Sequence, residues 1–141
     1  MILVDTGPLV ALSDPRDEQN KKALRECRRL REEGLVTCEA IVTEACFHLK
    51  EPHERLRLAS TLKDLRIGDV SWPSPGPHWS PVLEWMARYA DHRPDWADAC
   101  IAVLSGLNPQ LRVWTFDREF HTIWKRPDGS RIPVVARSAS S

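Results

Sequence analysis

Three short apolar segments, each followed by helical periodicity, constrain the fold of this 141-residue chain more than any other feature. They are Ile2-Leu3-Val4, Leu35-Val36-Thr37 and Arg112-Val113-Trp114-Thr115, and each is typical of a buried strand. Between the first two, the apolar residues of 17–33 recur at helical spacing, and Gly34 is expected to end that helix. Strands that alternate with helices favour a parallel sheet covered on both faces. We therefore predict an α/β fold.

The rest of the chain continues the alternation. Its periodicity predicts helices at about 39–50, from 52 towards 68, and at about 81–91, 95–105 and 118–124. Residues 69–72 fit a third strand and 132–135 a weak last strand. The loop-rich stretch 72–81 holds four prolines and is expected to be a surface connection, not a domain linker. The prediction is one domain over residues 1–141, with 138–141 as a frayed tail.

Four acidic residues, far apart in the chain, stand beside apolar segments. Asp5 follows the first strand, Asp117 follows the segment 113–116, and Glu44 and Asp98 lie among apolar helix residues. A carboxylate in such surroundings needs a hydrogen bond, an ion pair or a bound cation, because desolvating it alone is costly. If the fold gathers all four, a divalent metal is the natural counter-ion, and metal-assisted hydrolysis of a phosphodiester is the leading hypothesis.

Each acid also has an ordinary explanation. Asp5 is able to bond the backbone of the Thr6-Gly7 turn, and Asp95 and Asp117 are able to cap the helices that follow them. Taken singly, capping is the better explanation for Asp95 and Asp117. Asp95 and Asp98 are three residues apart and share one helical face, where two carboxylates repel each other unless a cation lies between them.

Composition separates few classes of function. Lys+Arg and Asp+Glu both total 20, so the net charge argues neither for nor against a nucleic-acid partner. Basic residues gather at 21–31 and again at 112–137, although acids interleave the first group and a solvated helix face explains it equally well. Trp96 beside Asp95 offers a surface for stacking an RNA base, but packing is the more common role of a tryptophan.

The remaining features indicate a soluble protein of the cytoplasm. The four cysteines show no C-x-x-C pair, which predicts buried free thiols in a reducing compartment and argues against a structural zinc site. No stretch approaches the roughly 20 apolar residues of a membrane span, and the first apolar run is too short for a signal peptide. No Ser-His-Asp or Cys-His arrangement is evident, so a nucleophilic side chain is not expected.

The motifs resemble those of PIN-domain ribonucleases, most closely the VapC toxins of toxin-antitoxin pairs. The resemblance spans nearly the whole chain and rests on four motifs in order: Ile2-Leu3-Val4-Asp5-Thr6-Gly7-Pro8-Leu9, Thr43-Glu44, Asp95-Trp96-Ala97-Asp98-Ala99-Cys100-Ile101-Ala102 and Val113-Trp114-Thr115-Phe116-Asp117-Arg118-Glu119-Phe120. It implies a PIN-like three-layer α/β/α fold whose central parallel sheet has about four to five short strands. One departure is Gly7, where many members carry serine or asparagine.

The resemblance also implies a site and its partners. Asp5, Glu44, Asp98 and Asp117 would be catalytic, with Mg²⁺ or Mn²⁺ held by Asp5, Asp98 and Asp117 and by Asp95 as an accessory ligand. Thr6 and Thr115 would supply hydroxyl groups behind these ligands. The implied partners are an RNA substrate, a cognate antitoxin and a second copy in a homodimer, with no membrane.

The function that follows is a metal-dependent endoribonuclease, the toxin of a type II toxin-antitoxin pair. Two alternatives stay open: a non-catalytic RNA-binding or scaffold PIN domain, and a housekeeping RNA-processing nuclease. An aspartic protease, which also carries an Asp-Thr-Gly triplet, is disfavoured because such enzymes are all-β and this chain is rich in helices.

Overall fold

A computed structural model of the chain describes residues 1–70, 72–73 and 78–136, and its centre is a parallel sheet with the strand order β3-β2-β1-β4. The strands are β1 (Ile2–Val4), β2 (Leu35–Thr37), β3 (Gly68–Asp69) and β4 (Arg112–Trp114). β1 lies between β2 and β4, with Leu3 opposite Val36 on one side and Val113 on the other. Because every pairing is parallel, the carboxyl ends of the strands share one edge.

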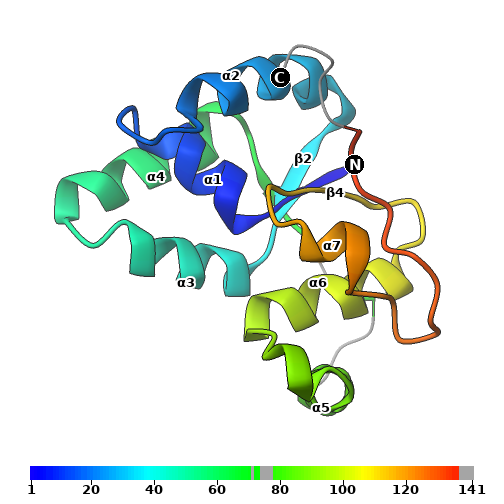
Figure 1. Cartoon of the computed structure of the whole chain (residues 1–141). Coiled ribbons are helices and arrows are strands. Elements are labelled where there is room, and N and C mark those ends of the chain that lie inside the picture. Colours follow the sequence, from blue (N-terminus) through cyan, green and yellow to red (C-terminus); the bar gives the residue numbers. More distant parts are fainter. Residues whose placement is uncertain (71, 74–77, 137–141) are drawn as a thin grey trace.

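Helices cover both faces of this sheet (Figure 1), and α3 contacts both α1 and α6. In Figure 1, α1, α2 and α4 lie on one side of the strands, and α5 and α6 on the other. The α-helices are α1 (Thr6–Ser13), α2 (Asn20–Leu30), α3 (Glu39–His48), α4 (Pro52–Asp64), α5 (Trp79–Arg88), α6 (Trp96–Leu107) and α7 (Glu119–Thr122). The predicted three-layer α/β/α fold, with a central parallel sheet of about four to five short strands, is confirmed with four strands among the described residues.

The core explains why the strands carry so few polar residues. All of β1 is buried, because a strand in the middle of a parallel sheet has helices against both of its faces. The helix α6 is buried along nearly its whole length and is correspondingly apolar. Gly34 ends the first helical stretch as predicted, with a φ of +83° that other residues rarely adopt. Cys27, Cys38 and Cys100 are buried, whereas Cys46 is partly exposed.

Two of the predicted strands differ in the structure. The third strand was expected at 69–72, but β3 spans only Gly68–Asp69, after which the Val70 N–H donates to the Thr37 carbonyl. Residues 132–135 do not form the predicted last strand. They make one isolated parallel bridge, between Val113 and Val134, because Pro133 has no N–H with which to extend the ladder.

Several helices begin elsewhere than the periodicity predicts. The helix expected at 17–33 is α2, which begins only at Asn20, followed by a 3₁₀ turn at Arg31–Glu33. The late start has a local cause, since the side chain of Asp17 accepts a hydrogen bond from the Gln19 N–H and forms a turn before the helix. The helix expected at 81–91 begins at Trp79 and is followed by a 3₁₀ turn at Ala90–His92. Pro81 lies in its first turn, where a missing N–H costs no hydrogen bond.

Part of the predicted organisation lies outside the described residues. This applies to Ser71 within the expected third strand at 69–72, to 74–77 within the proline-rich connection, and to the expected tail at 138–141. Within the residues that are described, no helix is both long and apolar enough to cross a membrane.

Candidate active site

The carboxyl edge of the sheet borders a cavity of about 390 Å³, which we call the acidic cavity. Its lining contains all five acids singled out in the sequence: Asp5, Glu44, Asp95, Asp98 and Asp117. They come from the end of β1, the middle of α3, the start of α6 and the segment after β4. Parallel strands with helical crossovers bring such positions together, although they are distant in the sequence.

Asp5 is the most buried of these carboxylates, with 6% of its surface exposed. One oxygen, Oδ1, accepts from the Thr6 N–H at 2.7 Å and so caps α1. The other, Oδ2, accepts from the Thr115 hydroxyl at 2.7 Å. Burial raises the pKa of Asp5 to about 6, against the opposing effect of these two hydrogen bonds. Asp5 is therefore both a helix cap and a carboxyl that is reluctant to ionise.

Glu44 faces the cavity from α3 and is partly buried. The Thr6 hydroxyl donates to its Oε2 at 2.9 Å, which ties α3 to the first turn of α1. Burial, and next the negative charge of Asp95, raise the pKa of Glu44 to about 7. Thr6 thus donates hydrogen bonds to two of the acids, to Glu44 from its hydroxyl and to Asp5 from its backbone N–H.

Asp95 and Asp98 form a reciprocal cap at the start of α6. The Asp98 N–H donates to Asp95 Oδ1 at 2.8 Å, and the Asp95 N–H donates to Asp98 Oδ2 at 3.2 Å. Capping and membership of the cavity are therefore compatible, because each carboxylate uses one oxygen for the cap. Burial and the adjacent charge of Asp95 raise the pKa of Asp98 to about 8.

Thr115 joins Asp117 to Asp5. Its hydroxyl donates to Asp5 and accepts from the Asp117 N–H at 2.9 Å. Asp117 Oδ1 in turn accepts from the Glu119 N–H at 2.9 Å, so Asp117 also supports the start of α7. The predicted hydroxyl residues, Thr6 and Thr115, thus both lie against the acids.

The donor set suits a hard divalent cation. Every acidic side chain offers oxygen, the ligand that Mg²⁺ and Mn²⁺ prefer, and no lysine or arginine lines the acidic cavity among the described residues. Burial and mutual repulsion disfavour ionisation of Asp5, Glu44 and Asp98, and a cation would relieve that repulsion. In the described part of the chain, no three His, Cys, Asp or Glu side chains already lie close enough to surround an ion. The residues fit the cation by chemistry, not by a preformed ligand cage.

Two further ionisable residues, Asp17 and His48, line the cavity without having been proposed from the sequence. Asp17 belongs to the turn before α2, and nothing in its local pattern distinguishes it from an ordinary turn aspartate. His48 ends α3, four residues after Glu44. That spacing places both side chains on one helical face, and it was the signal available in the sequence.

Comparisons with known proteins agree with this architecture. The family model of the PIN domain matches residues 2–125. The crystal structure of VapC20 of Mycobacterium tuberculosis, described as a toxin that cleaves the sarcin-ricin loop, superimposes with a TM-score of 0.63 at 19% sequence identity. The match covers 86% of this chain and 93% of that one. No curated protein matches the sequence. A family model that covers nearly the whole chain, together with the shared fold, shows that this chain belongs to the PIN-domain family.

Proposed function

We propose that the chain is a divalent-metal-dependent endoribonuclease that hydrolyses RNA phosphodiester bonds at the acidic cavity. The observation that carries the proposal is the gathering of Asp5, Glu44, Asp95, Asp98 and Asp117 from four separate segments at one cavity. Helix caps alone would not need to meet. Self-repelling carboxylates without a lysine or arginine in the described lining call for a metal cation.

The side chains divide the work in this proposal. Asp5, Asp98 and Asp117 would hold the ion, with Asp95 as an accessory ligand, while the hydroxyls of Thr6 and Thr115 keep the acids in place. When bound, Mg²⁺ or Mn²⁺ lowers the pKa of water and neutralises charge on the phosphoryl group. Glu44, which accepts a hydrogen bond from the Thr6 hydroxyl, would accept a proton from the attacking water.

We further propose that this nuclease is the toxin of a type II toxin-antitoxin pair in the cytoplasm. The support is the shared fold with VapC20, described as a toxin that cleaves the sarcin-ricin loop, over 93% of that chain. On this proposal the partners are RNA, a cognate antitoxin and a second copy of the chain. A housekeeping nuclease or a non-catalytic scaffold would share the fold but not the cellular effect of a toxin.

An RNase assay tests the proposal. Asp5→Asn, Glu44→Gln and Asp98→Asn each remove one charge at nearly constant size, and each is expected to lower Mg²⁺- or Mn²⁺-dependent cleavage at least about 100-fold. EDTA should abolish the wild-type activity. Asp91→Asn is the matched control, because Asp91 is exposed and does not line the acidic cavity. Full cleavage in EDTA, or in any of the three variants, would contradict a metal nuclease.

A further inference from the structure

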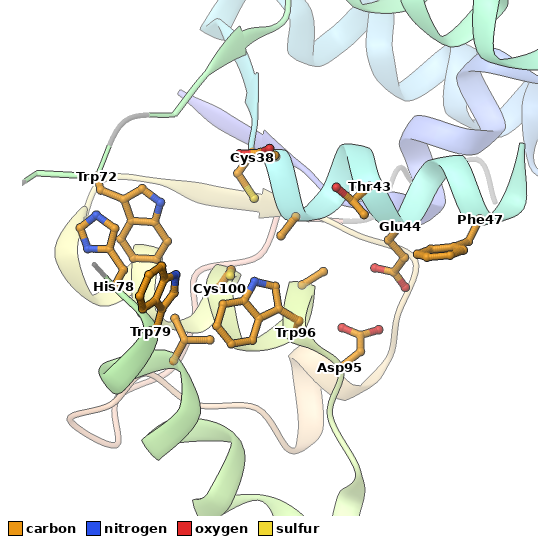
Figure 2. A pocket seen from close by; sticks show the side chains of 14 residues that line it. Cys38, Thr43, Glu44, Phe47, Trp72, His78, Trp79, Asp95, Trp96 and Cys100 are labelled. Carbon is orange, nitrogen blue, oxygen red and sulfur yellow. The ribbon is translucent and has the colours of Figure 1, made fainter. Parts of the chain in front are cut away.

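A second and larger cavity, of about 900 Å³, adjoins the acidic cavity and shares Glu44 and Asp95 with it. We call it the aromatic groove, after the rings of Phe47, Trp72, His78, Trp79 and Trp96 in its lining. Figure 2 shows the two carboxylates at one end, and Trp72, His78 and Trp79 at the other, with Trp96 between them. Any molecule that fills the groove therefore comes close to the proposed catalytic acids.

The rings are unusually exposed for their size. The exposed fraction is 69% for Phe47, 66% for Trp79 and 38% for Trp96. At the far end of the groove, the rings of Trp72 and His78 stack with centroids 4.1 Å apart and planes 12° from parallel. Aromatic side chains from α3, α5 and α6 thus converge on one surface without being needed for the core. Exposed apolar surface of this kind marks a binding site.

The charges of the groove restrict what it holds. Of the described residues that line it, none is a lysine or arginine, whereas Glu39, Glu44 and Asp95 contribute carboxylates. A phosphate group would be repelled there. A positively charged side chain, that of Lys22, lies beside the acidic cavity instead. Its Nζ is 4.8 Å from the ring centroid of Phe116, which lines that cavity. The phosphate backbone of an RNA is therefore favoured near the metal ligands and Lys22, outside the groove.

We propose that the aromatic groove binds unpaired nucleobases next to the scissile phosphate of a single-stranded RNA. The proposal rests on the proposed function and specifies its substrate. A nucleobase is neutral and has a π-face that stacks on Phe47, Trp79 or Trp96. The N–H groups on its edge donate hydrogen bonds that carboxylate oxygens accept. Bases inside a duplex are already stacked and paired, so only an unpaired segment is able to enter.

A second copy of the chain fits the groove less well. An apolar protein surface pressed onto these rings would also bury the carboxylates of Glu39, Glu44 and Asp95 and offer no donor to their remaining oxygens, which is costly. The N–H edges of bases supply those partners. The continuity with the acidic cavity points the same way, because a nucleotide chain held at the metal ligands places its next base within the adjoining groove.

Binding of short single-stranded oligoadenylate and oligocytidylate tests the proposal, with Ca²⁺ in place of Mg²⁺ and the RNA checked for integrity. Trp79→Ala and Phe47→Ala are each expected to raise the Kd about 5- to 150-fold, the range for loss of one stacked base. Trp79→Tyr and Phe47→Tyr, which keep a ring, should restore most of the affinity. Leu56→Ala is the matched control, because Leu56 is also 69% exposed and lies on α4 outside the groove.

A hairpin RNA without unpaired segments gives a second readout. Wild type should prefer the single strand, and Trp79→Ala should lose that preference. An unchanged Kd in both alanine variants overturns the proposal. It is overturned equally if Trp79→Ala turns a dimer into a monomer while each protomer binds RNA as before, since the groove then holds a second copy. If wild type binds RNA through Trp79 but never cleaves it with Mg²⁺ or Mn²⁺, the nuclease proposal fails and the groove proposal stands.

Discussion

At the scale of single residues, two threonines hold the acids of the cavity in position. Thr115 bonds Asp5 and Asp117 with one hydroxyl, and Thr6 bonds Asp5 through its backbone and Glu44 through its side chain. These bonds matter because the carboxylates repel one another and would otherwise turn towards solvent. Each threonine therefore acts on the site through the acids, without a part in the reaction itself.

Replacing Thr115 tests this role. Thr115→Val keeps the shape but leaves the buried Asp5 Oδ2 and the Asp117 N–H without their partner. We expect the free energy of unfolding to fall by about 1–3 kcal/mol, and the affinity for Mg²⁺ or Mn²⁺ to fall about 10- to 100-fold. Urea denaturation and calorimetric titration measure the two. Thr115→Ser should recover both values, and Thr122→Val, at an exposed threonine on α7, should change neither. A serine variant as impaired as the valine one would rule out the hydroxyl.

The raised pKa values predict how stability depends on pH. Burial lifts the pKa of Asp5 from 3.8 to about 6, of Glu44 from 4.5 to about 7 and of Asp98 from 3.8 to about 8. The folded state therefore binds these protons more tightly than the unfolded state does. Their contribution to stability is complete below about pH 4 and is lost as the pH rises towards about 8.

The free energy of unfolding, measured in EDTA, should accordingly decline as the pH rises from about 4 to about 8. The same measurement on Asp98→Asn shows how much of the decline comes from other groups. The decline of this variant should be smaller than that of wild type. Saturating Mg²⁺ should flatten the wild-type curve near neutral pH, since a cation stabilises the ionised carboxylates. Stability that rises from pH 5 to pH 8 in EDTA, in wild type but not in Asp98→Asn, would show that Asp98 is stabilised as an anion.

At the scale of elements, the start of α6 combines two functions. Asp95 and Asp98 cap the helix reciprocally and also contribute two of the six carboxylates of the acidic cavity. The helix dipole favours negative charge at this position, yet the pKa of Asp98 is raised, so burial and repulsion outweigh the dipole. A site built on a helix start is held rigidly by the same bonds that begin the helix.

This balance predicts the behaviour of Asp98→Asn. The asparagine carbonyl is able to accept from the Asp95 N–H, as Asp98 Oδ2 does, so the cap is kept while one charge is removed. Without metal at neutral pH, the Tm should be equal to or higher than that of wild type. Mg²⁺ or Mn²⁺ should raise the Tm of wild type more than that of the variant. Thermal melts of both proteins provide the comparison, and a lower metal-free Tm for the variant, with no metal response in wild type, would contradict a cation site.

The elements also show what a sequence is able to predict. β1, β2 and β4 were predictable because a strand covered on both faces of a sheet is largely apolar. β3 was misplaced because it is an exposed edge strand of two residues, which no burial pattern marks. The acids next to the predicted strands could be assigned to one edge by topology alone. Asp17 could not, because its place in the cavity depends on the conformation of the turn that connects α1 to α2.

At the scale of the whole molecule, an even charge balance conceals a strongly uneven distribution. The chain has 20 basic and 20 acidic residues, yet six of the acids line one cavity. On the proposed function, an RNA phosphate approaching that cavity would be repelled until a divalent cation is bound. The metal is therefore expected to be needed for substrate binding as well as for the reaction. The net charge of the chain does not reveal this need, because it averages over the acid cluster.

Production of the wild-type chain in a host cell is expected to arrest growth. The reason is the proposed role as a toxin, which rests on the fold shared with VapC20 over 93% of the VapC20 chain. Asp5→Asn should be harmless, since it removes the charge of the most buried acid in the cavity. Asp91→Asn should arrest growth as wild type does. Growth curves and gels of total RNA measure the outcome, and co-production of the cognate antitoxin should restore growth. If wild type is harmless while the purified protein cleaves RNA, the toxin proposal is wrong and the nuclease proposal survives.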